Sequence, residues 1–146
     1  MVSMTAADES LDRSFGLYRD LVPQLDRAVL ASRLGDVPSN SVGAQLWCVV
    51  GAQESYARAI VAGTWAGFSC WLDATGDPVE VSQALDRSAA SVSEAIGSID
   101  PPSRAQERLI LDLLEHEAQH HGQLIRYLYG LKLPIPASWK ARYALE

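Results

Sequence analysis

The sequence contains little cysteine, no excess of basic residues and no long uncharged apolar run. Two cysteines in 146 residues, Cys48 and Cys70, are too few for a disulfide framework. The 12 Lys and Arg residues stand against 18 Asp and Glu residues, for a net charge of −6. The chain also has no basic stripe, which argues against nucleic-acid binding. The longest uncharged runs contain Gly, Ser and Gln and do not predict a membrane span.

The N-terminal stretch MVSMTAADES has neither the positive region nor the apolar region of a signal peptide. We therefore expect a cytoplasmic protein that has no membrane or nucleic-acid partner. The composition, 48% hydrophobic and 21% charged, is that of an ordinary globular protein. A chain of this length predicts one domain, over residues 1–146.

Long patterns with helical periodicity are present, and no segment shows a convincing strand pattern. The first helix is expected from about Thr5 to Ala31, with a kink or break at Pro23. The second is expected at about Val42–Ala62 and the fourth at about Arg104–Tyr129. The third has an inner face of Val81, Leu85, Ser88, Val92 and Ile96.

Capping signals support these boundaries. Ser39, Asn40 or Ser41 can cap the second helix, which ends near Gly63. Asp77, Pro78 and Glu80 predict a capping box at the start of the third helix, and Ser103 with Gln106 predicts another at the fourth. Gly130 is the expected C-cap of the fourth helix.

Together these elements predict an all-α fold, an antiparallel four-helix bundle with a short C-terminal helical tail after Pro136. The connector TWAGFSCWLDATGD is long and aromatic. It is either a functional loop or a flap over one end of the core.

All three histidines lie in the fourth helix. His116 and His120 continue the core-facing stripe of this helix, whose other members are Leu109, Leu113, Leu124 and Tyr127. Two residues four apart are neighbours on a helix, so both imidazoles can reach one ion. His121 is turned by about 100° and should point elsewhere. The alternative is that His116 and His120 are buried histidines satisfied by hydrogen bonds.

The segment HEAQH, residues 116–120, also matches the short signature of zinc peptidases. Those enzymes need a third ligand downstream, and the only acidic residue after His120 is Glu146. The extended form of the motif fails at Gly122 and Arg126. Glu117 would sit beside the inward stripe. A zinc peptidase is therefore not predicted.

The second helix offers Cys48 as a third ligand, because helical bundles build metal sites from facing helices. A thiolate binds zinc and other borderline-soft ions well. The alternative for Cys48 is a small core residue.

Two segments, QLWCVVGAQESY and HEAQHHGQLIRYLYGLKLPIPASW, resemble the DinB/YfiT-like family of four-helix-bundle proteins. In that family the last helix carries His-x-x-x-His and then Arg or His, Gly and Gln. These positions correspond to His116, His120 and the run His121-Gly122-Gln123. Cys48 stands where the family has a histidine on its second helix. The tail is also similar, at Ser138, Trp139, Arg142 and Tyr143.

The resemblance implies a divalent metal ion, bound here by Cys48, His116 and His120. The Cys-for-His replacement favours zinc, and nickel is the alternative. It also implies a transferase that adds a low-molecular-weight thiol to a small electrophile, or a related hydrolase, and a homodimer. The contrasting hypothesis is a non-catalytic, small-molecule-binding or stress-related dimer whose metal site is degraded or purely structural.

Two further groups of residues are expected around the site. Gln119 or Gln123 is expected to orient a metal-binding imidazole. Four aromatic residues are expected to form the wall of an apolar pocket, Trp47, Trp65, Phe68 and Trp71. The alternative for these aromatics is ordinary packing.

Overall fold

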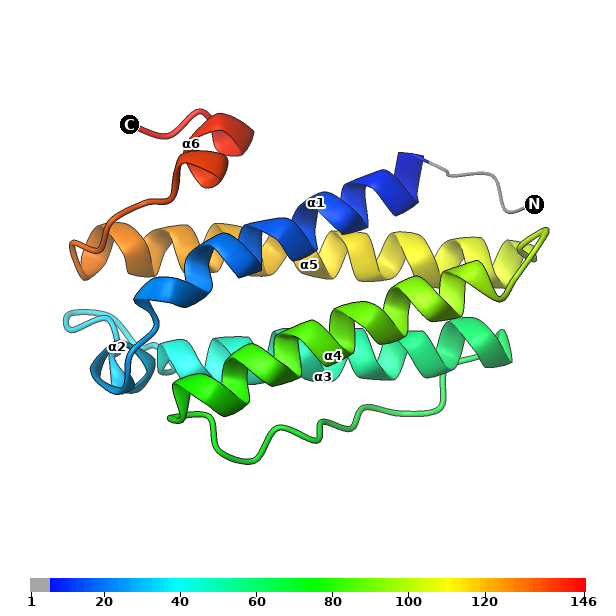
Figure 1. Ribbon diagram of the computed structural model, residues 1–146, viewed down its shortest axis with the longest axis horizontal. Helices are drawn as coiled ribbons and strands as arrows, with labels where there is room; N and C mark the ends of the chain where they lie inside the picture. The colour runs from blue at the N-terminus through cyan, green and yellow to red at the C-terminus, as the bar shows by residue number, and fades with distance from the viewer. Residues whose placement is uncertain (1–5) are drawn as a thin grey trace.

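A computed structural model describes residues 6–146, and this part of the chain is all-α (Figure 1). The helices are α1 (Ala6–Leu21), the 3-10 turn η1 (Val22–Gln24), α2 (Arg27–Ala31), α3 (Val42–Ala62), α4 (Pro78–Gly97), α5 (Arg104–Gly130) and α6 (Ala137–Tyr143). The start expected at Thr5 lies outside the described residues. None of the described helices is long and apolar enough to cross a membrane.

The first expected helix is broken at Pro23 and does not run to Ala31 as one rod. α1 ends at Leu21, and a 3-10 turn with Pro23 in it follows. Proline has no N–H, and its ring clashes with the carbonyl four residues earlier, so the helix cannot continue through it. A new helix, α2, then begins behind Asp26, whose side chain accepts a hydrogen bond from the Val29 N–H at 2.8 Å.

The expected N-caps are confirmed, but one of the two expected capping boxes is not. Ser41 caps α3, and Ser103 and Gln106 form the reciprocal capping box of α5. Asp77 caps α4 by accepting from two backbone N–H groups. The capping box expected at α4 does not form, because the Asp77 N–H donates to the Ala74 carbonyl instead of to Glu80.

The expected C-cap at Gly130 is wrong, whereas Gly63 does end α3 with a left-handed φ of 75°. Gly130 is the last residue of α5, and the left-handed residue is Lys132, with φ 56°. The Leu133 N–H donates to the Leu128 carbonyl at 2.8 Å, which closes the helix end. A Cβ at Gly130 would lie 2.6 Å from a methyl carbon of Leu34, so the Leu34 side chain would have to shift to admit a larger residue.

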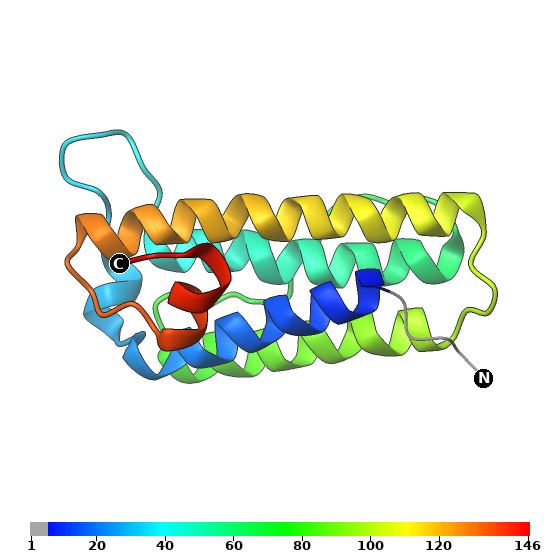
Figure 2. The same ribbon diagram turned by 90° about the horizontal axis from the view of Figure 1, so that it is seen from above.

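The four long helices form a bundle in which α1 and α3 each contact α4 and α5. The sequence pattern predicted an antiparallel bundle, but the helices are not antiparallel throughout. α3 and α4 run in the same direction, and α1 and α5 run opposite to them (Figures 1 and 2). The connector permits this arrangement, because 14 extended residues span up to about 46 Å and the 21-residue α3 is only about 31 Å long.

The connector returns along α3 from its C-terminal end to its N-terminal end (Figure 1). The Ser69 N–H donates to Ser55 Oγ, and the Trp71 N–H donates to Glu54 Oε2, both at 3.0 Å. Gly51 lets the connector lie close to the helix, because a Cβ there would overlap the ring of Phe68. The connector is therefore an ordered strap on α3.

The apolar core consists of two clusters separated by a layer of buried polar residues. One cluster lies around Leu46 and Leu124, and the other lies around Leu11 and Leu113. Each of the four long helices contributes one buried polar residue to the layer between the clusters. These residues are Ser14, Gln53, Ser88 and Glu117. The tail joins the first cluster through Trp139, which is 0% exposed and donates to the Leu17 carbonyl at 2.7 Å.

Candidate metal centre

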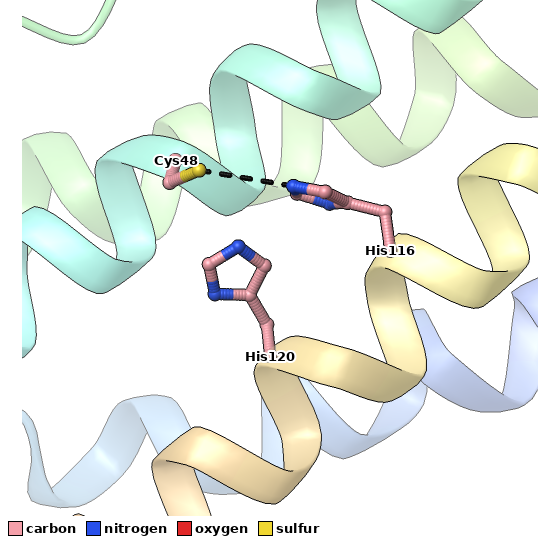
Figure 3. A group of neighbouring side chains, drawn as sticks. All are labelled: Cys48, His116 and His120. Atoms are coloured by element: carbon pink, nitrogen blue, oxygen red, sulfur yellow. Dashed lines mark hydrogen bonds between the residues drawn. The ribbon is translucent and has the colours of Figure 1, made fainter.

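Cys48 from α3 and two histidines from α5 point toward one another across the interface of these helices (Figure 3). His116 and His120 lie one turn apart on the same face of α5. One ligand atom from each of the three residues lies within 4.8 Å of the other two. Cys48 and His116 are partly buried, and His120 is 5% exposed. The group is thus shielded without being sealed.

The separation of the sulfur and the first imidazole matches that of two ligands of one tetrahedral ion. Cys48 Sγ lies 3.7 Å from His116 Nε2. Zn–S and Zn–N bonds at a tetrahedral angle place S and N about 3.6 Å apart. No two ligand atoms of the group are more than 4.8 Å apart, so the most distant pair would need to close by at most about 1.5 Å to meet tetrahedral geometry.

Gln45 orients the second imidazole. His120 Nδ1 lies 2.9 Å from Gln45 Oε1, and a carbonyl oxygen can only accept a hydrogen bond. Nδ1 therefore carries the proton and donates it, which leaves the lone pair on Nε2. Nε2 is the nitrogen that faces Cys48 (Figure 3). This arrangement is the one that a metal-binding histidine requires.

The sequence pattern had assigned this role to Gln119 or Gln123. Gln119 is exposed to solvent, and Gln123 is partly buried with an Oε1 that has no partner among the described residues. The signal for Gln45 was its position three residues before Cys48, which places both on one face of α3. His116 has no counterpart of Gln45, because its buried Nδ1 also lacks a partner in residues 6–146.

Burial sets the protonation of all three residues at neutral pH. It lowers the pKa of His116 and, together with the charge of His116, lowers the pKa of His120 to about 4. Both imidazoles are therefore neutral and able to donate a lone pair to a metal. Burial raises the pKa of the Cys48 thiol. A metal that binds the sulfur must displace this proton.

His121 points away from the triad, as expected, but it is buried in the polar layer. Its Nε2 lies 2.8 Å from Ser14 Oγ, and its Nδ1 lies 2.5 Å from the Tyr143 hydroxyl. Burial first, and then the charges of Arg142 and His120, lower its pKa to about 4. The sequence pattern did not predict that this third histidine would be part of the core.

Glu117 is 0% exposed and lies in the same polar layer. It accepts hydrogen bonds from Ser14 Oγ at 2.5 Å and Gln53 Nε2 at 3.1 Å. Burial outweighs these bonds and raises its pKa to about 7. In the zinc-peptidase motif the corresponding Glu is the general base, whereas Glu117 is held inside the bundle.

The four aromatic residues expected around one pocket do not line a common hollow. Trp47 packs against Phe68 with ring centroids 5.2 Å apart, and Trp65 packs against Tyr56 at 4.9 Å. Trp71 is 76% exposed. It borders a hollow of about 740 Å³ between α3 and α4. The reason is the path of the strap, which distributes its aromatic residues along the length of α3.

None of the protein-family models, curated proteins or solved structures compared with this chain matches it.

Proposed function

We propose that this protein binds one divalent metal ion through Cys48, His116 and His120, and that it transfers a low-molecular-weight thiol to a small electrophile. The observation that supports this function best is the 3.7 Å separation of Cys48 Sγ and His116 Nε2. The motifs that resemble the DinB/YfiT-like family add to it, because they include both histidines and the position of Cys48.

The donor set favours zinc over nickel. One thiolate and two imidazoles are typical ligands of zinc, and the thiolate is soft enough to disfavour magnesium or calcium. Within residues 6–146, the candidate metal-binding group consists of three ligand residues. Structural zinc sites have four protein ligands, whereas catalytic sites have three and keep one position for water or substrate.

The protein residues prepare the site for this chemistry. Both imidazoles are neutral at pH 7, and Gln45 holds the ring of His120 with its lone pair toward Cys48. A bound metal ion would supply charge that lowers the pKa of a thiol or water at the open position. In the transfer, the substrate thiol releases its proton to water, its sulfur forms a bond to an electrophilic carbon, and the leaving group departs from that carbon with the bonding electron pair.

A second candidate function is a metal-free module that binds a small molecule. The unpartnered Nδ1 of His116 favours it, because a metal-bound imidazole usually has a hydrogen-bond partner on its other nitrogen. The homodimer expected from the resemblance stays a prediction in either case.

The metal content of protein purified without a histidine tag tests the proposal. We expect one equivalent of zinc in the unmodified protein and none in His116→Ala or His120→Ala. Gln119→Ala is the matched control, since Gln119 is an exposed residue of the same helix. Metal-free protein, or equal metal content in all the variants, would contradict the proposal.

A further inference from the structure

A polar pocket adjoins the candidate metal centre at the end of the bundle where α3 begins. It encloses about 560 Å³ between residues 34–40, the first turn of α3 and the last turns of α5. Its lining consists of Leu34, Pro38, Ser39, Asn40, Gln45, Gln123, Arg126 and Tyr127. We call it the Arg126 pocket. Its volume suits a small organic molecule.

Gln45 connects this pocket to the metal centre. Its side chain lines the pocket, and its Oε1 accepts the hydrogen bond from His120 Nδ1 at 2.9 Å. A molecule in the Arg126 pocket would therefore be separated from His120, one of the three residues that would hold the metal, by the side chain of Gln45. His120 and Arg126 are six residues apart on α5, which places them about 9 Å apart along the helix axis.

The chemistry of the lining indicates what the pocket binds. Among the residues that the structure describes, Arg126 is the only charged one in the lining. It is exposed and forms no ion pair with a carboxylate in residues 6–146. Gln123 also belongs to the lining, and its side-chain amide can form hydrogen bonds with a polar ligand.

The loop that closes the pocket is held in place. The Leu34 N–H donates to Ser39 Oγ at 2.8 Å, and Arg33 donates to the Ser39 carbonyl at 3.0 Å. The Tyr127 hydroxyl, from α5, donates to the Asn40 carbonyl. The pocket is thus formed before a ligand arrives, which reduces the entropy lost on binding.

From these observations we propose that the Arg126 pocket binds the anionic end of the thiol substrate. This inference rests on the proposed thiol transfer and specifies its substrate class. The substrate is a thiol whose carboxylate is separated from its sulfur by a chain long enough to pass Gln45 and reach Arg126.

Cobalt-loaded protein allows a direct test, because a thiolate that binds Co²⁺ produces a charge-transfer absorption band. The probes are 6-mercaptohexanoate and its neutral analogue 6-mercaptohexanol, and the readout is the absorbance change on titration. We expect the acid to bind about 10-fold more tightly than the alcohol, as one charged hydrogen bond would provide. We expect 3-mercaptopropionate, which is too short to reach Arg126, to bind no more tightly than 6-mercaptohexanol.

Arg126→Gln should remove the preference for the acid and leave the affinity for the alcohol unchanged. Arg58→Gln is the matched control, because Arg58 is an exposed arginine that borders the other hollow, between α3 and α4. Equal affinity for acid and alcohol in the unmodified protein would overturn the inference. A loss of both affinities in Arg126→Gln would overturn it too.

A second measurement separates this inference from the proposed function. Hexanoate has the carboxylate without the sulfur, and it can be titrated into chelator-treated protein while the side-chain amide resonances of Gln45 and Gln123 are followed by NMR. We expect both resonances to shift in the unmodified protein and not in Arg126→Gln. If cobalt does not bind but these shifts occur, the metal proposal fails and the anion pocket stands. If they do not occur, the anion pocket is wrong.

Discussion

The Nδ1 atom of His120 donates a hydrogen bond to Oε1 of Gln45 at 2.9 Å, across the interface between α5 and α3. This bond fixes the ring so that its other nitrogen faces the sulfur of Cys48. It is also the point at which the candidate metal centre meets the Arg126 pocket.

Gln45→Ala should weaken zinc binding without removing a ligand. Loss of the partner of a metal-bound histidine usually lowers metal affinity about 10- to 100-fold. Competition with a chromophoric chelator measures the change. Gln119→Ala, whose parent side chain is exposed, should bind zinc as the unmodified protein does. An unchanged affinity in Gln45→Ala would show that the Gln45–His120 bond does not serve the metal.

Replacement of Cys48 distinguishes the sulfur ligand from a mere neighbour. Cys48→Ala should lose cobalt, because two imidazoles alone hold the ion weakly. Cys48→His should keep cobalt, because the partly buried position has room for a third imidazole. In that variant the near-ultraviolet band from sulfur to cobalt should disappear. The band's persistence in Cys48→His would assign it to another sulfur, with Cys70 as the remaining cysteine.

His121→Ala should keep its metal and lose stability. The imidazole bonds to Ser14 and Tyr143 in the polar layer, away from the triad. Its removal leaves buried groups without partners, which destabilises a fold by about 2 kcal/mol. Urea denaturation of chelator-treated protein measures the stability, and elemental analysis measures the metal. Loss of metal from folded His121→Ala would mean that the faces of α5 are wrongly assigned.

Glu117→Gln should stabilise the protein at high pH and have little effect at low pH. The pKa of Glu117 is raised from 4.5 to about 7 by burial. Below pH 4.5 the carboxyl is protonated in both folded and unfolded states, so its ionisation has no effect on stability. As the pH rises toward 7, the carboxyl of residue 117 ionises freely only in the unfolded state. The free energy of unfolding therefore falls by up to about 3 kcal/mol.

Urea denaturation of both proteins at pH 5 and pH 8, without metal, checks this prediction. The lowered pKa values of His120 and His121 act in the opposite direction, since they make stability rise with pH between about 4 and 6.5. Their contribution is common to both proteins and cancels in the difference. If Glu117→Gln changes the free energy of unfolding equally at both pH values, the pKa of Glu117 is not raised in the folded state.

Removal of the metal should lower the melting temperature of the loaded protein. A ligand that binds only the folded state adds about 2.7 kcal/mol when it is present at 100 times its dissociation constant. Thermal unfolding with and without a chelator measures the shift, and His116→Ala provides the control in which chelation should change nothing. Identical curves for the unmodified protein would favour the metal-free module.

The sequence alone was sufficient for the features that depend on neighbouring residues. The observed bounds of α3, Val42–Ala62, are those expected from the pattern. The break at Pro23 and the capping box of α5 were also predictable, because a missing N–H or a side-chain cap acts within one turn. The pairing of His116 with His120 follows from helical geometry in the same way.

Only the tertiary structure decided which faces meet. The direction of α4 relative to α3 depends on the path of the strap between them. The helical pattern of α4 is the same whether it runs parallel or antiparallel to α3, so the sequence pattern did not determine the direction. The sequence pattern favoured Gln119 or Gln123 as the partner of an imidazole, whereas the packing of α3 on α5 places Gln45 beside His120. His121 and Glu117 lie in the core because α1 supplies Ser14 opposite them. Helical periodicity determines which residues share a face, but contacts between distant segments determine what that face touches.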